Sequence, residues 1–223
     1  MSFWQKIYNL FLDLIFPLEC AICKESGSSI CQNCLDKIPI SKREFTVDGV
    51  GIHYFYNFRE PTIHQLLWQA KYHHNLHVLK ILGSVLGKEL VKDFDKAKTF
   101  LIPIPLSKKD SRLHNHAQVL AEATGFPICD ILEKDTEQKQ ARLEHKGDRQ
   151  ENVKGKIVIN HKKLEKFLKV QDLNLDSRDL QDYKKYTFLL IDDVVTTGST
   201  LLEAKKVLEQ ASLKIKSIYT LAH

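Results

Sequence analysis

The sequence predicts an α/β protein with a mostly parallel sheet, preceded by a small cysteine-rich module. Three observations favour this fold class. From about Val47 onward, apolar strand-like segments alternate with segments of helical spacing, which is typical of βαβ units. The segment 187–191 (TFLLI) is continuously apolar, as expected for a central strand that is buried on both faces. Residues 18–40 instead contain two C-x₂-C pairs and few core-forming residues.

Length and composition limit the class of protein. The 223 residues suit one domain of ordinary size plus a small appendage. A net charge of +5 favours anionic partners such as phosphate compounds, nucleic acid or a membrane surface, without choosing among them. There is no secretory signal and no apolar run of the ~18–20 residues that span a bilayer. We therefore expect a cytoplasmic protein with reduced thiols.

An N-terminal amphipathic helix is expected at residues 1–17. Apolar side chains recur there at helical spacing until Pro17 ends the pattern. Lys6 is its only basic residue, whereas helices that lie on membranes are normally rich in Lys and Arg. Packing against the rest of the protein is therefore preferred. Peripheral association with the inner face of the cytoplasmic membrane is the alternative.

The next range, 18–45, is expected to form a zinc-binding module, either a ribbon or a knuckle. Its C-x₂-C-x₇-C-x₂-C pattern consists of Cys20, Cys23, Cys31 and Cys34. Two such pairs supply four thiolates for a tetrahedral zinc ion, with no open position for water, so the metal would be structural. A pair of disulfides is the alternative, which the cytoplasmic setting disfavours. Cys129 lies apart and is interpreted as a small buried hydrophobic residue.

The range 46–223 is expected to form the α/β domain. Strands are predicted at 50–58, 100–104, 127–132, 157–159, 187–191 and 214–222. Helices are predicted at 62–71, 77–93, 111–124 and 199–211. The charged stretch 161–185 is interpreted as an insertion that is partly helical and exposed.

The segment 189–200 (LLIDDVVTTGST) has the composition of a sugar-phosphate site. It combines a strand end, a loop and a helix start, where ligands of α/β sheets bind and where helix N–H groups favour anions. Gly198 allows close approach of the backbone. The adjacent carboxylates of Asp192 and Asp193 suit sugar hydroxyls or a cation. An ordinary helix N-cap is the alternative, but it accounts for only one or two of these residues.

This segment closely resembles the motif of type I phosphoribosyltransferases that binds phosphoribosyl pyrophosphate (PRPP). The resemblance implies that Asp192 and Asp193 engage the ribose hydroxyls, directly or through Mg²⁺. It also implies that residues 196–200 surround the 5′-phosphate. The full expected set is Asp192, Asp193, Val194, Val195, Thr196, Thr197, Gly198, Ser199 and Thr200.

A Cys₄ module ahead of a type I phosphoribosyltransferase-like domain resembles the ComF family, which is linked to DNA uptake in natural transformation. Residues 101–106 (LIPIPL) are similar to the family's V-P-V-P-L strand. Residues 112–116 (RLHNH) keep the Arg and Asn of its R-G-F-N-Q stretch but differ at three positions. A later Q-x-x-L-x₅-R-x₂-N-V-x-G pattern fits Gln140, Leu143, Arg149, Asn152, Val153 and Gly155.

Other basic residues are weaker candidates. By resemblance, Lys108 and Lys109 follow a strand where this fold commonly contacts pyrophosphate; a solvated lysine pair is an equal alternative. Lys71 is a lesser candidate for the same ligand. Arg142 and Arg149 fall where the fold often has a mobile loop over the ligand, although an exposed loop without a catalytic role is preferred.

Histidines and aromatic residues raise two further options. His73 and His77 have the i,i+4 spacing of a helical metal site, but a partly exposed basic patch is preferred because no glutamate supports them. Single-stranded DNA binding needs exposed aromatic side chains in a cationic groove. The candidates, for which core packing is the default, are Tyr54, Tyr56, Phe58, Trp68 and Tyr72.

The leading hypothesis is a ComF-like protein that binds PRPP–Mg²⁺, contains structural zinc and takes part in DNA uptake. Single-stranded DNA and other DNA-uptake proteins are its expected partners. One alternative is an active phosphoribosyltransferase of nucleotide metabolism, although no acceptor pocket is visible in the sequence. The other is a non-catalytic regulator whose partner affinity depends on PRPP.

Overall fold

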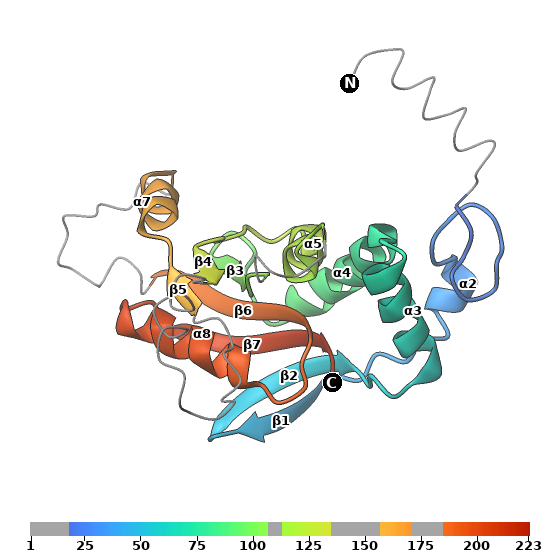
Figure 1. The fold of residues 1–223 in the computed structure, drawn as a ribbon, viewed down its shortest axis with the longest axis horizontal. Helices are drawn as coiled ribbons and strands as arrows, with labels where there is room; N and C mark the ends of the chain where they lie inside the picture. Colours follow the sequence, from blue (N-terminus) through green and yellow to red (C-terminus); the bar gives the residue numbers. More distant parts are fainter. Residues whose placement is uncertain (1–17, 107–112, 135–156, 171–184) are drawn as a thin grey trace, which may run out of the picture.

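The computed structural model describes residues 18–106, 113–134, 157–170 and 185–223 (Figure 1). Several sequence-based expectations fall outside these ranges. They are the helix at 1–17, the residues Lys108, Lys109, Arg142 and Arg149, and the second half of the charged insertion.

A five-stranded sheet with the order β1-β2-β7-β6-β3 forms the centre of the molecule. Its strands are β1 (Arg43–Val47), β2 (Val50–Tyr56), β3 (Thr99–Pro103), β6 (Thr187–Val194) and β7 (Ile215–Ala222). Neighbouring strands are parallel except for β1, which is antiparallel to β2. A separate antiparallel pair joins β4 (Leu132–Lys134) to β5 (Ile157–Ile159). The expected α/β fold with a mostly parallel sheet is confirmed.

Strand β1 was not expected from the sequence. It forms a hairpin with β2 through Asp48 and Gly49, which both have positive φ, of 49° and 77°. This conformation is that of the two-residue turn whose twist matches a hairpin. Because β1 begins at Arg43, the first strand of the sheet lies across the boundary expected between residues 45 and 46.

Helices cover both faces of the sheet (Figure 1). On one side lie α3 (Pro61–Tyr72), α4 (Leu76–Leu90) and α5 (His116–Thr124), and on the other lies α8 (Ser199–Gln210). The short α2 (Gln32–Leu35) belongs to the cysteine-rich module, and α7 (His161–Val170) begins the charged insertion. The start of α3 is fixed by Pro61, and α5 ends at Gly125, whose φ is 73°.

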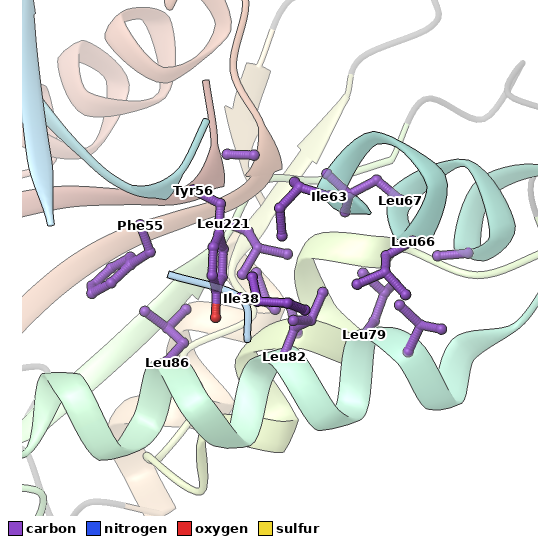
Figure 2. Packing of buried hydrophobic residues seen from close by; sticks show 14 of the residues in the cluster. Ile38, Phe55, Tyr56, Ile63, Leu66, Leu67, Leu79, Leu82, Leu86 and Leu221 are labelled. Atoms are coloured by element: carbon purple, nitrogen blue, oxygen red, sulfur yellow. The ribbon is translucent and has the colours of Figure 1, made fainter. Parts of the chain in front are cut away.

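Alternate residues of β6 enter two different cores. Leu189 and Ile191 pack with α3, α4 and α5. Figure 2 shows side chains that α3 and α4 contribute to this cluster. Phe188 and Leu190 pack with α8 in a second core on the opposite face of the sheet. All four side chains are at most 2% exposed. This two-sided burial explains why the segment is apolar without alternation.

Two glycines of α4 bring α5 close to it. A Cβ atom on Gly83 would lie 2.6 Å from the carbonyl oxygen of Leu120, and one on Gly87 would lie 2.3 Å from that of Thr124. Only glycine therefore allows this separation of the two helices. The close packing fixes α5 beside the sheet, with its first residue near the ends of β3 and β6.

Two of the expected elements differ in the structure. No strand covers 127–132, because the chain makes one parallel bridge between Ile128 and Leu101 and then turns where the N–H of Ile131 donates to Cys129 O.

The charged insertion is not simply exposed. The apolar side of α7 packs on the second core, where the Phe167 ring lies 4.9 Å from that of Phe100. Cys129 is fully buried, as expected.

Candidate functional site

The acidic pair lies at the carboxyl end of β6, which extends further than the sequence indicated and includes both aspartates. Asp192 is opposite Thr220 in β7, so the backbone of the pair is held by the sheet. Val195 follows with its side chain in the second core and its N–H donating to Ala222 O at 3.1 Å. The strand and this anchor together fix where the following loop begins.

Hydrogen bonds at the end of β6 orient the two carboxylates. The N–H of Asp193 donates to Oδ1 of Asp192 at 2.9 Å, and the N–H of Val194 donates to Oδ1 of Asp193 at 2.8 Å. Burial and then the charge of Asp193 raise the pKa of Asp192 well above its usual value. Burial also acts to raise the pKa of Asp193, but hydrogen bonds from His116 and Asp192 outweigh it and lower that pKa. A bound cation would favour the ionised form of both groups.

His116 supplies the side chain that pairs with Asp193. Its Nδ1 atom lies 3.2 Å from Oδ2 of Asp193, and the residue is only 4% exposed. Asn115 places it there, because its side chain accepts from the N–H of Ala117 and donates to Ile104 O at 2.9 Å. Asn115 therefore caps α5 and ties the helix start to the end of β3. Sequence reasoning missed His116 as a site residue and noted it only as a departure from R-G-F-N-Q.

The loop 196–200 has the features of an anion site. Thr196, Thr197 and Ser199 are exposed, and the hydroxyl oxygens of Thr197 and Ser199 lie 3.0 Å apart. Helix α8 starts after Gly198, which offers no capping side chain, and the N–H of Ser199 donates to Oγ1 of Thr197 at 3.4 Å. The positive end of the helix dipole favours an anion at this turn. Gly198 has a φ of 74°, and a Cβ atom there would lie 2.9 Å from Ile52 Cδ1. The loop conformation thus requires glycine.

A cavity of about 510 Å³ adjoins the acidic pair. One side is formed by His116, Asp193 and Thr196, and another by residues of α3 that include Trp68 and Lys71. Lys71, a weaker candidate on sequence alone, is therefore brought to the same cavity as Asp193.

The five aromatic residues considered for DNA binding differ in their burial. Tyr56 is 2% exposed, as core packing predicts. Trp68 and Tyr72 are 45% and 58% exposed, so core packing was the wrong expectation for these two. Their place in the cavity wall makes them available to a ligand.

The four cysteines of the N-terminal module converge on one point. Their sulfur atoms all lie within 4.8 Å of one another, and each cysteine is a free thiol in the structure. Four thiolates at this spacing suit a tetrahedral zinc ion. Burial acts to raise the pKa of the Cys20 thiol, but hydrogen bonds from backbone N–H groups such as those of Cys23 and Cys31 outweigh burial. The pKa of Cys20 is lowered to about 6. Burial and the neighbouring thiols raise the pKa of Cys34 to about 12.

The module packs directly on the helices of the domain. The side-chain amide of Gln65 in α3 donates to Ala21 O, and Ser29 Oγ donates to Asn75 Oδ1 at 3.2 Å. Cys20 and Cys34 belong to the same buried cluster as the apolar residues of α3 and α4. The cysteine-rich module is therefore continuous with the core that includes α3 and α4.

The i,i+4 histidine pair is not formed on one helix. His73 follows the end of α3, whereas His77 lies within α4. Within the described ranges, the cysteine cluster is the group of three or more histidine, cysteine or carboxylate side chains that converge closely enough to hold a metal ion.

Comparison with known proteins agrees with this geometry. Residues 83–223 match the phosphoribosyl transferase domain family. The chain belongs to this family. The matched range contains β3, β6 and the acidic pair. The matched range begins within α4, so α3 and the cysteine module precede it.

A relative with similarity over most of the chain is the "Competence protein ComFC" of Streptococcus pneumoniae (strain ATCC BAA-255 / R6). The two are 25% identical over 200 residues, which cover 87% of this phosphoribosyl transferase family member and 81% of ComFC. Together with the cysteine cluster, this similarity confirms the resemblance to the ComF family. No described helix combines the length and apolar character required to cross a membrane.

Proposed function

We propose that the protein binds PRPP together with Mg²⁺ at the acidic pair and the loop 196–200. The observation that carries this proposal is the order of groups along one strand end. Two carboxylates that suit a cation or sugar hydroxyls are followed by exposed hydroxyls and the N-terminal end of α8, which suit a phosphate. His116 holds Asp193 from the neighbouring helix. Membership of the phosphoribosyl transferase family supports the choice of ligand.

Calorimetry tests this proposal. Zinc-loaded full-length protein is titrated with PRPP in the presence of Mg²⁺, and the titration is repeated with Asp192→Ala. The wild type should bind and the variant should lose most of its affinity. Glu165→Ala, on the exposed side of α7, removes a carboxylate away from the site and should bind like the wild type. Absence of binding by the wild type would refute the proposal.

The biological role proposed is participation in DNA uptake during natural transformation. Its proposed partners are single-stranded DNA and other DNA-uptake proteins. Similarity to ComFC over most of the chain supports it. In this role the protein acts in the cytoplasm, and attachment of the segment 1–17 to the inner face of the membrane is the alternative to its packing on the rest of the protein. Deletion of the gene should reduce DNA import and transformation, and an Asp192→Ala allele should fail to restore them. Unchanged transformation after deletion would contradict the role.

A second candidate function is phosphoribosyl transfer. The cavity next to Asp193 favours it, because an acceptor needs space beside the bound sugar. In that reaction pyrophosphate leaves C1 of the ribose while a nitrogen nucleophile forms the new bond to C1. The protein positions the two reactants and stabilises charge. Pyrophosphate release that requires an acceptor and is lost in Asp193→Ala would establish turnover.

A non-catalytic regulator would behave differently. PRPP would then alter the protein's affinity for DNA or a protein partner without being consumed. This requires that the partner-bound and partner-free forms of the protein bind PRPP with different affinities. Affinity for a single-stranded oligonucleotide, measured with and without PRPP, distinguishes this alternative from turnover.

A further inference from the structure

The four cysteines of the N-terminal module differ in their access to solvent. Cys20 and Cys34 are 0% and 8% exposed and lie in the buried cluster of α3 and α4, whereas Cys23 is exposed and Cys31 is partly exposed. Sγ of Cys20 also accepts from the N–H of Cys31 at 3.4 Å. Burial and hydrogen bonding both protect a sulfur atom from electrophiles, so an oxidant in solution meets Cys23 and Cys31 first.

The sulfur atoms of Cys23 and Cys31 also lie next to each other. They are 3.6 Å apart, and they belong to different C-x₂-C pairs. The backbone holds the two pairs together, because the N–H of Ala21 donates to Ser29 O at 2.9 Å. A disulfide bond is about 2 Å long, so the approach of the two side chains that would form it is short. The accessible cysteines of the module are therefore also a pair that can be oxidised together.

The surroundings of Cys23 indicate which oxidants can reach it. Cys23 Sγ lies 4.0 Å from Oε2 of Glu25, on the exposed side of the module. A carboxylate at this distance opposes the approach of an anion such as oxidised glutathione, and it does not oppose a neutral molecule. A small uncharged hydroperoxide fits these conditions best.

We propose that Cys23 and Cys31 form a site of reversible oxidation, at which a hydroperoxide converts the two thiolates to a disulfide bond and the metal ion of the module is released. The Cys23 sulfur attacks one oxygen of hydrogen peroxide, which gives a sulfenic acid and hydroxide. The Cys31 sulfur then displaces the sulfenic oxygen as a second hydroxide and forms the S–S bond. Both hydroxides take protons from the solvent and become water, so two electrons pass from the thiolates to the peroxide.

The disulfide leaves the module with too few ligands for its metal. Only Cys20 and Cys34 remain as thiolates, whereas a structural zinc site uses four ligands. The thermal midpoint of the protein should therefore fall on oxidation, because metal binding contributes to the folding of small modules. A reductant supplied together with zinc reverses the change, since a disulfide can be reduced whereas a sulfinic acid cannot. This modification goes beyond PRPP binding and does not require it.

Peroxide treatment of the whole protein tests the proposal. Zinc-loaded full-length protein is exposed to increasing hydrogen peroxide, and zinc release is followed with a chromogenic chelator. Free thiols are blocked at each point, and disulfide-linked peptides are mapped by mass spectrometry. The link between Cys23 and Cys31 should appear first, and its yield should rise in proportion to the released zinc. Cys129, which is 0% exposed in the second core, should stay reduced. Dithiothreitol with added zinc should restore the metal content and the thermal midpoint.

Two histidine variants separate the exposed pair from the buried one. Cys23→His and Cys34→His each leave three cysteines and one histidine, a ligand set that binds zinc. Cys23→His should release zinc at least ~tenfold more slowly than the wild type, because the disulfide requires both sulfur atoms. Cys34→His keeps the exposed pair and should release zinc at least as fast as the wild type. The zinc content of each variant is measured before peroxide is added, and the disulfide map of the wild type decides the assignment if either variant does not fold.

The outcomes that would overturn the proposal are distinct. A first link between Cys20 and Cys23, or between Cys31 and Cys34, would contradict the assignment to the exposed pair. Retention of zinc until sulfinic or sulfonic acids form would exclude reversible oxidation. Faster release with oxidised glutathione than with hydrogen peroxide would exclude a hydroperoxide as the oxidant. Calorimetry of the reduced protein with PRPP measures the proposed function separately, so either proposal can fail while the other stands.

Discussion

The Nδ1 atom of His116 lies 3.2 Å from the Oδ2 atom of Asp193, which joins the first residue of α5 to the end of β6. The contact is almost fully enclosed, because His116 is 4% exposed. It connects two segments that are 77 residues apart in the sequence. The orientation of one proposed PRPP-binding carboxylate therefore depends on a helix that follows a different strand.

Replacement of His116 should affect ligand binding through Asp193. We expect His116→Ala to weaken PRPP–Mg²⁺ binding by about tenfold or more, since a hydrogen bond to a charged group contributes roughly 1.5–3 kcal/mol. His116→Gln restores the residue of the R-G-F-N-Q pattern and a side-chain donor, so it should retain most of the affinity. Calorimetry of the three proteins at one pH makes the comparison. Equal affinity in all three would show that the contact does not matter for the ligand.

The same variant should change the pH dependence of binding. Burial raises the pKa of Asp193, and the hydrogen bond from His116 is the largest of the causes that lower it. Without His116 that pKa rises, so Asp193 becomes protonated at a higher pH than in the wild type. As pH falls, His116→Ala should therefore lose PRPP–Mg²⁺ affinity before the wild type does. Parallel pH profiles would contradict this assignment.

Gly198→Ala should destabilise the loop for two separable reasons. Both Gly198 and Gly49 have positive φ, of 74° and 77°, which is unfavourable for alanine. A Cβ atom on Gly198 would also lie 2.9 Å from Ile52 Cδ1, whereas one on Gly49 meets nothing within 4 Å. We expect Gly49→Ala to lower the free energy of unfolding by about 1 kcal/mol, and Gly198→Ala by a further 1–3 kcal/mol or so. Urea titrations measure the difference, and equal losses would exclude the steric contribution.

Gly87→Ala should separate α4 from α5. The added Cβ atom would lie 2.3 Å from Thr124 O, which belongs to a helix end and cannot move without shifting α5. A loss of about 1–3 kcal/mol in unfolding free energy is expected. The adjacent exposed Lys88 provides a control, because Lys88→Ala should stay within about 0.5 kcal/mol of the wild type. Thermal or urea unfolding of both variants is the measurement.

Zinc content should depend on the N-terminal cysteines and not on Cys129. Cys34→Ser removes one of the four converging sulfur atoms and should greatly reduce the zinc that copurifies with the protein. Its thermal midpoint should fall, because metal binding contributes to the folding of small modules. Cys129→Ala changes a buried cysteine in the second core and should leave the zinc content unchanged. Elemental analysis of both proteins decides this, and equal zinc contents would contradict the assigned site.

Tyr56→Phe should stabilise the protein. The Tyr56 hydroxyl is buried without a hydrogen-bond partner among the described residues, and Figure 2 shows the side chain within the apolar cluster. Since such a group costs roughly 1–3 kcal/mol, we expect a gain of about 1 kcal/mol in unfolding free energy at neutral pH.

The alkaline range gives a second signature of Tyr56. Burial, and then the charge of Glu89, raises its pKa from 10.0 to about 12. Between these values the tyrosine ionises in the unfolded chain but stays neutral in the folded protein, so wild-type stability falls as pH rises from 10.0 to about 12. Tyr56→Phe should lose less stability over this interval. Tyr54→Phe, a change at a partly exposed tyrosine of the same strand, is the control.

The sequence predicted best what depends on neighbouring residues. The apolar strand, the acidic pair and the loop 196–200 are contiguous, so their order indicates the site without knowledge of the fold. The two C-x₂-C pairs are also local, and the sulfur atoms converge as expected. Strand β1 was missed because its sequence, REFTV, is a charged edge strand that is recognisable only beside its partner β2.

The remaining site residues depend on packing between distant segments. His116 becomes part of the site because Asn115 fixes the start of α5 at the end of β3. In α3, apolar residues at helical spacing mark the side with Leu66 as buried, whereas Trp68 and Tyr72 share another side with His64 and Lys71. The exposure of these two aromatic side chains and their place in a cavity wall depend on how α3 lies beside the end of β6, which the sequence alone does not give.

The contact between Gln65 and Ala21 connects the cysteine site to the cavity wall. It joins the turn after Cys20 to the helix that carries Trp68 and Lys71. If zinc fixes the position of α3, the metal and the cavity's ligand are thermodynamically linked. Each must then change the affinity of the other by the same factor. Zinc availability would then act as an allosteric input to ligand binding in the cavity.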